Sequence, residues 1–129
     1  MTEASGDGSS VPFLSIEQGS TSGIADPREV VIQSEQEWQT LWRQHAPLAA
    51  PRPPVDFAKH LVVGIFAGQQ PTSGYGVDIV SVERERGGIS VIYQVESPPK
   101  GAMVAQVVTQ PFHFIRLPRL GLPIRFKQL

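Results

Sequence analysis

The sequence of 129 residues contains no cysteine, which excludes disulfide bridges and thiolate metal sites. It has no apolar run near the roughly 20 residues that span a bilayer, and no apolar signal core at its N-terminus. As written, the chain predicts no membrane span and no export signal, and a cytoplasmic location is expected. A chain that starts after a removed signal peptide would instead belong to the cell envelope or be secreted.

Acidic residues are missing from the last part of the chain. All twelve lie at or before Glu96, and every later charge is basic: Lys100, Arg116, Arg119, Arg125 and Lys127. The last four, here called the C-terminal basic residues, have two explanations. They suit a charged edge strand that resists aggregation, or a stripe that docks an acidic protein surface. The net charge of −1 argues against nucleic acid as a partner.

Motifs for nucleotide binding and nucleophilic catalysis are also missing. The loop 68–76 has Tyr75 where a phosphate loop needs lysine, and Pro71 where a nucleophile elbow around Ser73 needs glycine. The following segment is strand-like, whereas a nucleophile elbow leads into a helix. We therefore expect a protein that is not an enzyme and needs no cofactor.

The histidines show no metal-binding pattern. His45, His60 and His113 are far apart, without His-x-x-x-His or His-x-His spacing, so no metal site is expected. Asp56 and His60 lie four residues apart and suit the entry to a strand, with Asp56 capping that turn. A hydrolytic cluster around Asp56, His60 or His113 is the remaining catalytic alternative, because residues distant in sequence can meet in a fold.

The length and the 40% content of hydrophobic residues fit one domain with an ordinary core. Residues 1–10 are small and polar and predict a flexible tail, followed by a single domain at 11–129. One helix is predicted at about 35–45. Ser34 is its N-cap, Glu37 completes a capping box, and the apolar face is Trp38, Leu41, Trp42 and His45. Core packing of both tryptophans is favoured over a binding cleft.

About seven or eight short strands are predicted. They are 11–17, 28–32, 61–67, 77–82, 89–95, 103–108, 112–117 and 122–126. The unbroken apolar run Leu61–Phe66 is typical of a central strand covered on both faces. The charged turn Glu83–Gly88 predicts a hairpin with a connection of four to six residues. Short links favour antiparallel pairing, so we predict a mainly-β domain, either a sandwich or a curled sheet closed by the helix.

The loop 68–76 is the most distinctive segment. It spends about nine residues between two predicted strands, and its core is Gln70, Pro71, Thr72, Ser73, Gly74 and Tyr75. Proline stiffens the loop and Gly74 permits a left-handed backbone, which would leave two hydroxyls at the apex. A stiff loop loses little entropy on binding. The sequence predicts a binding loop here, against a plain corner in which Tyr75 packs inward.

The order of several motifs resembles the PrcB C-terminal domain family over roughly residues 30–127. The motifs are Trp38-x-x-Leu41-Trp42, the stretch 53–57 (PPVDF), Leu61-Val62-Val63-Gly64, the loop 68–75, the breaker 98–101 (PPKG) and Thr109-Gln110-Pro111. The founding member of that family is an accessory lipoprotein of a secreted bacterial protease complex. The resemblance therefore implies a bacterial protein-binding domain whose partner is a protease.

The loop is also similar to the Asn-Pro-Thr-Thr-Gly-Tyr loop of chagasin-type cysteine-protease inhibitors, with Gln70 and Ser73 replacing two positions. The first functional hypothesis is thus a non-enzymatic module that is a protease-associated accessory or an inhibitor. The second is a small-ligand or glycan-binding β domain, which a pocket lined by Trp38 or Trp42 would favour. The oligomeric state is not set by the sequence.

Overall fold

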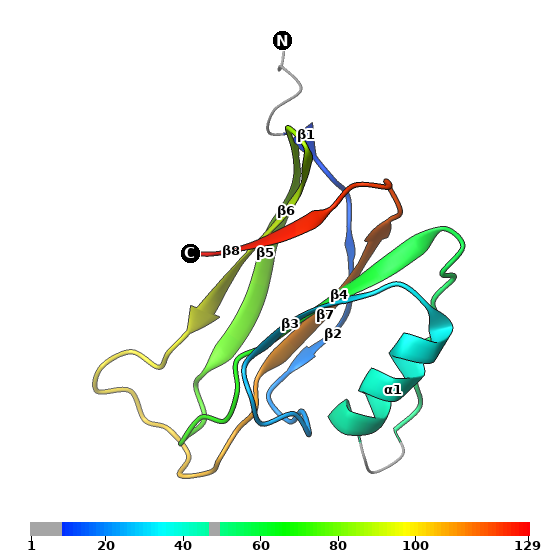
Figure 1. The fold of residues 1–129 in the computed structure, drawn as a ribbon. Helices are drawn as coiled ribbons and strands as arrows, with labels where there is room; N and C mark the ends of the chain where they lie inside the picture. Colours follow the sequence, from blue (N-terminus) through cyan, green and yellow to red (C-terminus); the bar gives the residue numbers. More distant parts are fainter. Residues whose placement is uncertain (1–8, 47–49) are drawn as a thin grey trace.

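Two four-stranded β-sheets and one helix make up the fold (Figure 1). The structure is a computed structural model that describes residues 9–46 and 50–129. The strands are β1 (Ser9–Ser10), β2 (Leu14–Gly19), β3 (Arg28–Ile32), β4 (His60–Phe66), β5 (Gly76–Glu85), β6 (Gly88–Glu96), β7 (Phe112–Pro118) and β8 (Ile124–Gln128). The helix α1 spans Glu35–His45. The predicted mainly-β class is confirmed, in its sandwich form.

The sheets form two layers and the helix forms a third. Sheet A has the strand order β1-β5-β6-β8, and sheet B has the order β2-β7-β4-β3. Figure 1 shows α1 on the side of sheet B that faces away from sheet A. Sheet B is therefore covered on both faces, whereas no described element covers the outer face of sheet A.

The central strand β4 explains how one apolar run serves two cores. Leu61, Val63 and Ile65 pack between the two sheets, while Val62 and Phe66 pack under the helix. Side chains alternate between the faces of a strand, so a strand covered on both sides must be apolar throughout. The predicted central strand is thus confirmed.

Gly64 creates the space that the aromatic core needs. A Cβ atom at this position would lie 2.8 Å from the ring of Phe114. That ring packs edge-on against Trp38, with centroids 5.2 Å apart. The glycine thus lets the ring of Phe114 lie close to the backbone of β4.

The helix begins and ends where the sequence predicts. The Ser34 hydroxyl accepts a hydrogen bond from the Glu37 amide at 3.2 Å, which confirms the N-cap. Both tryptophans are buried, and their indole N–H groups donate to the carbonyls of Pro53 and Ala50. Core packing of the tryptophans is confirmed, and replacing Trp38 by alanine would cost about 3–5 kcal/mol.

The predicted strand 103–108 is wrong. These residues belong to an irregular segment between β6 and β7, and most of them are exposed. The apolar spacing resembled a strand, but the chain here must cross from sheet A to sheet B. The breakers Pro98, Pro99 and Gly101 turn it away from any neighbouring strand with which it would pair.

Three other details of the sheets differ from expectation. The hairpin of β5 and β6 is confirmed, but its strands extend through the charged residues and leave only Arg86 and Gly87 between them. The first predicted strand, 11–17, is divided between the sheets, since the Val11 amide donates to Val82 of β5 and pairing with β7 starts at Leu14. The last strand, β8, runs parallel to β6, which is possible because the chain passes through β7 of the other sheet between them.

The predicted tail lies largely outside the described residues. Its last two residues form β1, which pairs with Glu83 and Arg84 of β5. Residues 1–8 and 47–49, the latter within the predicted proline-rich connector, are not described.

Candidate protein-binding surface

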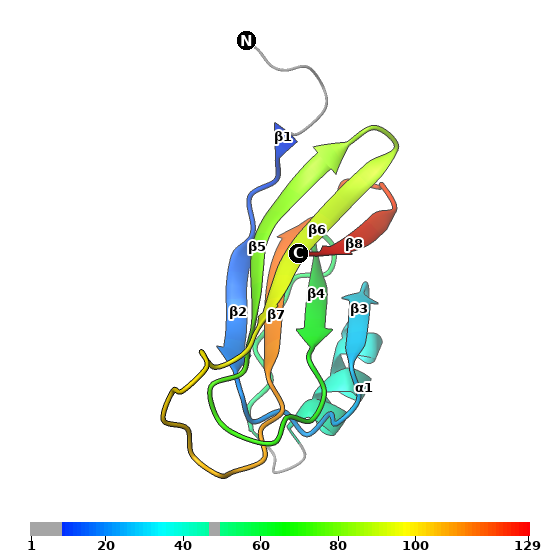
Figure 2. The same ribbon diagram turned by 90° about the vertical axis from the view of Figure 1, so that its left-hand side faces the viewer.

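Two loops lie together at the end of the sandwich opposite β1 (Figure 2). We call residues 67–75, between β4 and β5, the short apical loop, and residues 97–111, between β6 and β7, the long apical loop. Each one joins a strand of one sheet to a strand of the other. Stacked sheets are about 10 Å apart, so this crossing already accounts for part of the length of the short apical loop.

Six hydrogen bonds join the two apical loops, and the first runs from the Ala67 amide to the carbonyl of Pro111 at 3.0 Å. Gln70 and Thr109 exchange backbone bonds at 2.8 and 3.0 Å. Ser73 donates its amide to Ala105 at 3.1 Å, and its hydroxyl accepts the Ala105 amide at 2.7 Å. The Thr109 hydroxyl donates to the carbonyl of Thr72 at 2.8 Å. The two loops therefore brace each other as one unit.

The glycine predicted to reverse the chain does so. Gly74 has a φ of +93°, and a Cβ atom there would lie 2.8 Å from Cβ of Pro98 in the long apical loop. Any other residue would be strained by its backbone and would also push the loops apart. Gly74 is thus required both for the turn and for the close approach.

The structure places the other predicted loop residues in different surroundings. Pro71 is exposed, and Gln70 and Tyr75 are partly exposed. The Thr72 hydroxyl donates to the carbonyl of Ser73 at 2.9 Å, so both apical hydroxyls already make bonds within the apical loops. Their main effect is therefore to hold the shape of the loops.

The exposed apolar side chains of the long apical loop were not predicted from the sequence. Met103 is fully exposed at 101%, and Val107 and Val108 are 51% and 56% exposed. The two apical loops contain no aspartate, glutamate or histidine, and their one charge is Lys100. The proline pair before this run of apolar residues was the signal that it forms a loop.

The C-terminal basic residues do not form a single stripe. Arg116 lies on β7 of sheet B, while Arg125 and Lys127 lie on β8 of sheet A. The Arg119 guanidinium donates to the carbonyls of Phe57, at 2.6 Å, and Gln33, and so ties three segments together. Only Arg125 and Lys127 share one surface.

The predicted catalytic alternative does not converge. His60 pairs with Pro118 at one end of β4, whereas His113 pairs with Ile65, five residues along the strand and about 17 Å away. The Asp56 carboxylate accepts the Ala58 amide at 3.0 Å, which confirms its capping role. No group of three or more metal-binding side chains occurs within residues 9–46 and 50–129.

His113 lies between the sheets, beside Ser15, in an orientation unsuited to activating that serine. The Ile79 amide donates to Nδ1 of His113 at 3.0 Å, so the proton of the neutral ring is on Nε2 and points to the Ser15 hydroxyl at 2.9 Å. Burial lowers the pKa of His113, and nearby Asp78 partly offsets this. The neutral histidine on β7 thus joins β2 and β5 through hydrogen bonds.

His45 joins a second serine to a carboxylate. Its ring nitrogens lie 2.8 Å from the Ser22 hydroxyl and 2.9 Å from the Glu17 carboxylate. A nucleophile also needs free donors for an oxyanion. Here the amides of Ser22 and Gly23 already donate to the carbonyls of Gln110 and His45, and Ser22 is only 5% exposed. The arrangement anchors the end of α1 to β2.

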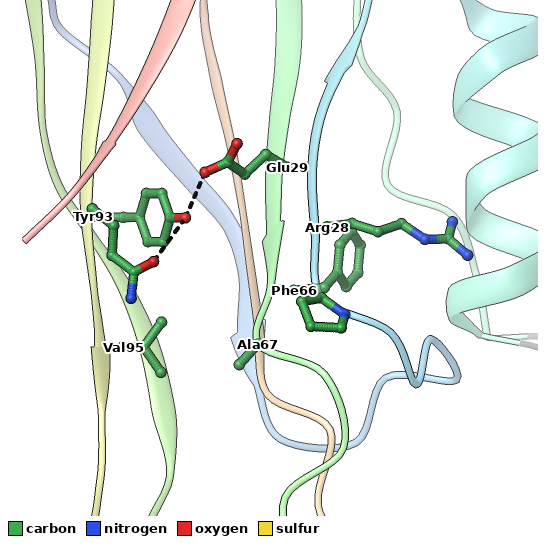
Figure 3. Close-up of a pocket in the computed structure, with 8 residues that line it drawn as sticks. Arg28, Glu29, Phe66, Ala67, Tyr93 and Val95 are labelled. Atoms are coloured by element: carbon green, nitrogen blue, oxygen red, sulfur yellow. Dashed lines mark hydrogen bonds between the residues drawn. The ribbon is translucent and has the colours of Figure 1, made fainter.

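A hollow of about 350 Å³ lies between the sheets on the side where β3 and β8 are the edge strands (Figure 3). The Tyr93 hydroxyl donates to the Glu29 carboxylate across it at 2.6 Å, and burial raises the pKa of Tyr93 to about 12. Figure 3 shows Arg28 turned away from the hollow. Neither Trp38 nor Trp42 lines this hollow or the four other hollows compared with it.

Comparison with known proteins gives one family. Residues 61–118, a little under half of the chain, match the family described as PrcB C-terminal. The matched segment runs from β4 to β7 and contains both apical loops. No curated protein and no solved structure matches the chain. No helix of the described residues is long and apolar enough to cross a membrane.

Proposed function

We propose that this domain is a non-enzymatic protein-binding module of a protease complex, and that the two apical loops form its contact surface. The family supports a protease-complex accessory role. The observation that carries the proposal is the group of three exposed apolar side chains, Met103, Val107 and Val108, on a braced and nearly uncharged support. In this proposal the likeness to inhibitor loops extends only to a stiff loop that precedes a strand.

The energetics favour protein contact at this end of the molecule. Full burial of an exposed methionine or valine side chain contributes about 1.5–3 kcal/mol. Because the two valines are already about half-buried, the three residues together can supply about 3–6 kcal/mol, a large part of a micromolar affinity. The loops are already ordered by the six bonds between them, which reduces the entropy lost on association. Apart from Lys100 they present no charge that would have to be desolvated.

The first experiment identifies the protease and then measures its affinity. Tagged protein captures partners from the native host, and a captured protease is purified and titrated against variants by calorimetry. Changing Thr72, Ser73 and Tyr75 to alanine should weaken binding at least tenfold by loosening the short apical loop. Equal binding by this variant and the wild type would reject the assignment of this loop.

The hollow between the sheets supports a second candidate, a small-ligand site. Its rim offers the Tyr93 hydroxyl and Glu29, and Val95 and Ala67 line its apolar part. Because neither tryptophan lines it, quenching of tryptophan fluorescence is a poor readout here. Ligand-observed NMR with a fragment library, repeated on Tyr93→Phe, tests it: hits that the substitution weakens support the site, and a library without hits rejects it.

A further inference from the structure

The outer face of sheet A is uncovered and carries segregated charges. Since Val77, Ile79, Val91 and Tyr93 point into the core between the sheets, the residues that alternate with them on β5 and β6 point outward. Outward residues on β5 include Glu83 and Glu85, those on β6 are Ser90, Ile92, Gln94 and Glu96, and those on β8 are Arg125 and Lys127. Ser90 is only 5% exposed. Asp78 does not belong to this face, because its carboxylate lies beside Gln18 of β2 and His113 of β7, in sheet B. The face is thus acidic along β5 and basic along β8, and β6 between them carries one charge, Glu96 at its end.

These charges make no ion pair in the described part of the chain. The strands β5 and β8 are separated by β6, so their backbones are two strand spacings, or about 10 Å, apart. Glu83 shares a hydrogen bond with the Ser81 hydroxyl, and Arg125 reaches the carbonyl of Arg86 at 3.3 Å. The acidic and basic rows therefore remain without opposite charges within one molecule.

The pairing register makes the face complementary to itself. Glu83, Ser90 and Arg125 form one row across the sheet, and Ser81, Ile92 and Lys127 form the next. A two-fold axis that runs parallel to β6, in the plane between two such faces, places β5 of each copy over β8 of the other. Glu83 then meets Arg125 of the second copy at the same height along the strands, and Ile92 meets its own counterpart.

We propose that a second copy of this chain docks on the outer face of sheet A, with the acidic row of β5 against the basic row of β8. This assigns a partner to Arg125 and Lys127, which lie far from the apical loops. Val80, 39% exposed at the bulge of β5, adds apolar area beside Ile92. The interaction does not involve the apical loops and leaves them free for another protein.

The size of the face sets the expected strength. A strand of 10 residues is about 33 Å long, and three strands span about 14 Å, so each copy buries roughly 450 Å². A standard stable interface buries about 800 Å² per partner. The dimer is therefore weak, forms at high protein concentration, and depends on salt because its charges lie at the surface.

Sedimentation velocity of the purified chain between about 20 μM and 1 mM tests the proposal. We expect dimers at the upper concentrations in low salt and their loss in 0.5 M NaCl. The double variant Arg125→Glu/Lys127→Glu should be monomeric, and so should Glu83→Lys/Glu85→Lys. An equal mixture of the two variants should restore dimers, because each then supplies the charges that the other lacks.

The matched control is Arg43→Glu/Arg116→Glu, which makes the same charge change on α1 and sheet B and should leave dimers unchanged. Circular dichroism checks that every variant is folded. A monomeric wild type at 1 mM in low salt would overturn the proposal, as would dimers that survive both charge reversals. Substitution of Met103, Val107 and Val108 by serine should not change the dimer, so this result is independent of the proposed function.

Discussion

The two apical loops differ in a way that separates shape from contact. The short apical loop has the unusual composition, yet its polar groups are largely engaged in hydrogen bonds with its neighbour. The long apical loop has an unremarkable composition, yet it exposes Met103, Val107 and Val108. A loop rich in proline, glycine and hydroxyls can thus support a binding surface that a neighbouring loop provides.

The largest expected effect comes from removing the exposed apolar side chains. Changing Met103, Val107 and Val108 to serine should weaken protease binding by about 100-fold or more, since about 3 kcal/mol of apolar burial is lost. The melting temperature should barely change, because these side chains are exposed. The matched control changes three exposed leucines outside the apical loops, Leu14, Leu120 and Leu129, to serine. Equal losses in the two variants would show that the effect is not local.

A smaller effect is expected from separating the loops. Gly74→Ala introduces a strained backbone and a contact with Pro98, and should cost about 1–3 kcal/mol of unfolding free energy. Binding should weaken by about tenfold because the long loop loses part of its support. Chemical denaturation and calorimetry measure the two effects. The control Gly101→Ala also has a positive φ but meets no atom within 4 Å, and should affect binding less.

Removing a single hydrogen bond between the apical loops should have a smaller effect than Gly74→Ala. Thr109→Val removes the hydroxyl bond to the carbonyl of Thr72, and Ser73→Ala removes the acceptor for the Ala105 amide. Each substitution should lower the free energy of unfolding by about 1 kcal/mol and weaken binding a few-fold. Each of these substitutions is then combined with Met103→Ser, and the affinity of the double variant is compared with those of the two single variants. This comparison shows whether the hydrogen bonds between the loops act through the long apical loop. Fully additive effects on binding would contradict that coupling.

Acidification should lower the stability of the sheets without changing the binding by the apical loops. Burial holds the pKa of His113 below the value near 6.5 of the unfolded chain, so the unfolded state gains protons first. Stability should therefore fall as the pH drops below about 6.5, and His113→Gln should reduce this dependence. The apical loops contain no histidine or carboxylate, so the binding constant of the domain should stay constant between pH 5.5 and 7.5. Binding that weakens while the domain is folded would argue against an apical contact.

The sequence predicted the elements that depend on local rules. The cap at Ser34, the helical face of Trp38 and Trp42, and the buried run of β4 each follow from residues close in the chain. The division of strands between two sheets did not, because it depends on contacts distant in sequence. The same limit explains why residues 103–108 were predicted to form a strand. Apolar spacing cannot show whether a neighbouring strand is present to pair with them.

The candidate surface was predicted only in part, because some of its features also depend on residues distant in sequence. Gly74 could be assigned its turn from its residue type, and the structure adds that it must also admit Pro98. The hydroxyls of Thr72 and Ser73 were expected to face a partner, but the atoms with which they bond lie some 30 residues along the chain or in the loop itself. Sequence could not reveal those bonds.

The most direct test uses the fact that the chain has two methionines, Met1 and Met103. With ¹³C-methyl-methionine labelling, each gives one NMR signal, and Met103→Leu assigns them. On titration with the captured protease, the account predicts that the Met103 signal shifts or broadens until the binding is saturated, while that of Met1 serves as the internal reference. An unchanged Met103 signal at saturation would contradict the assignment of the long apical loop as the contact surface.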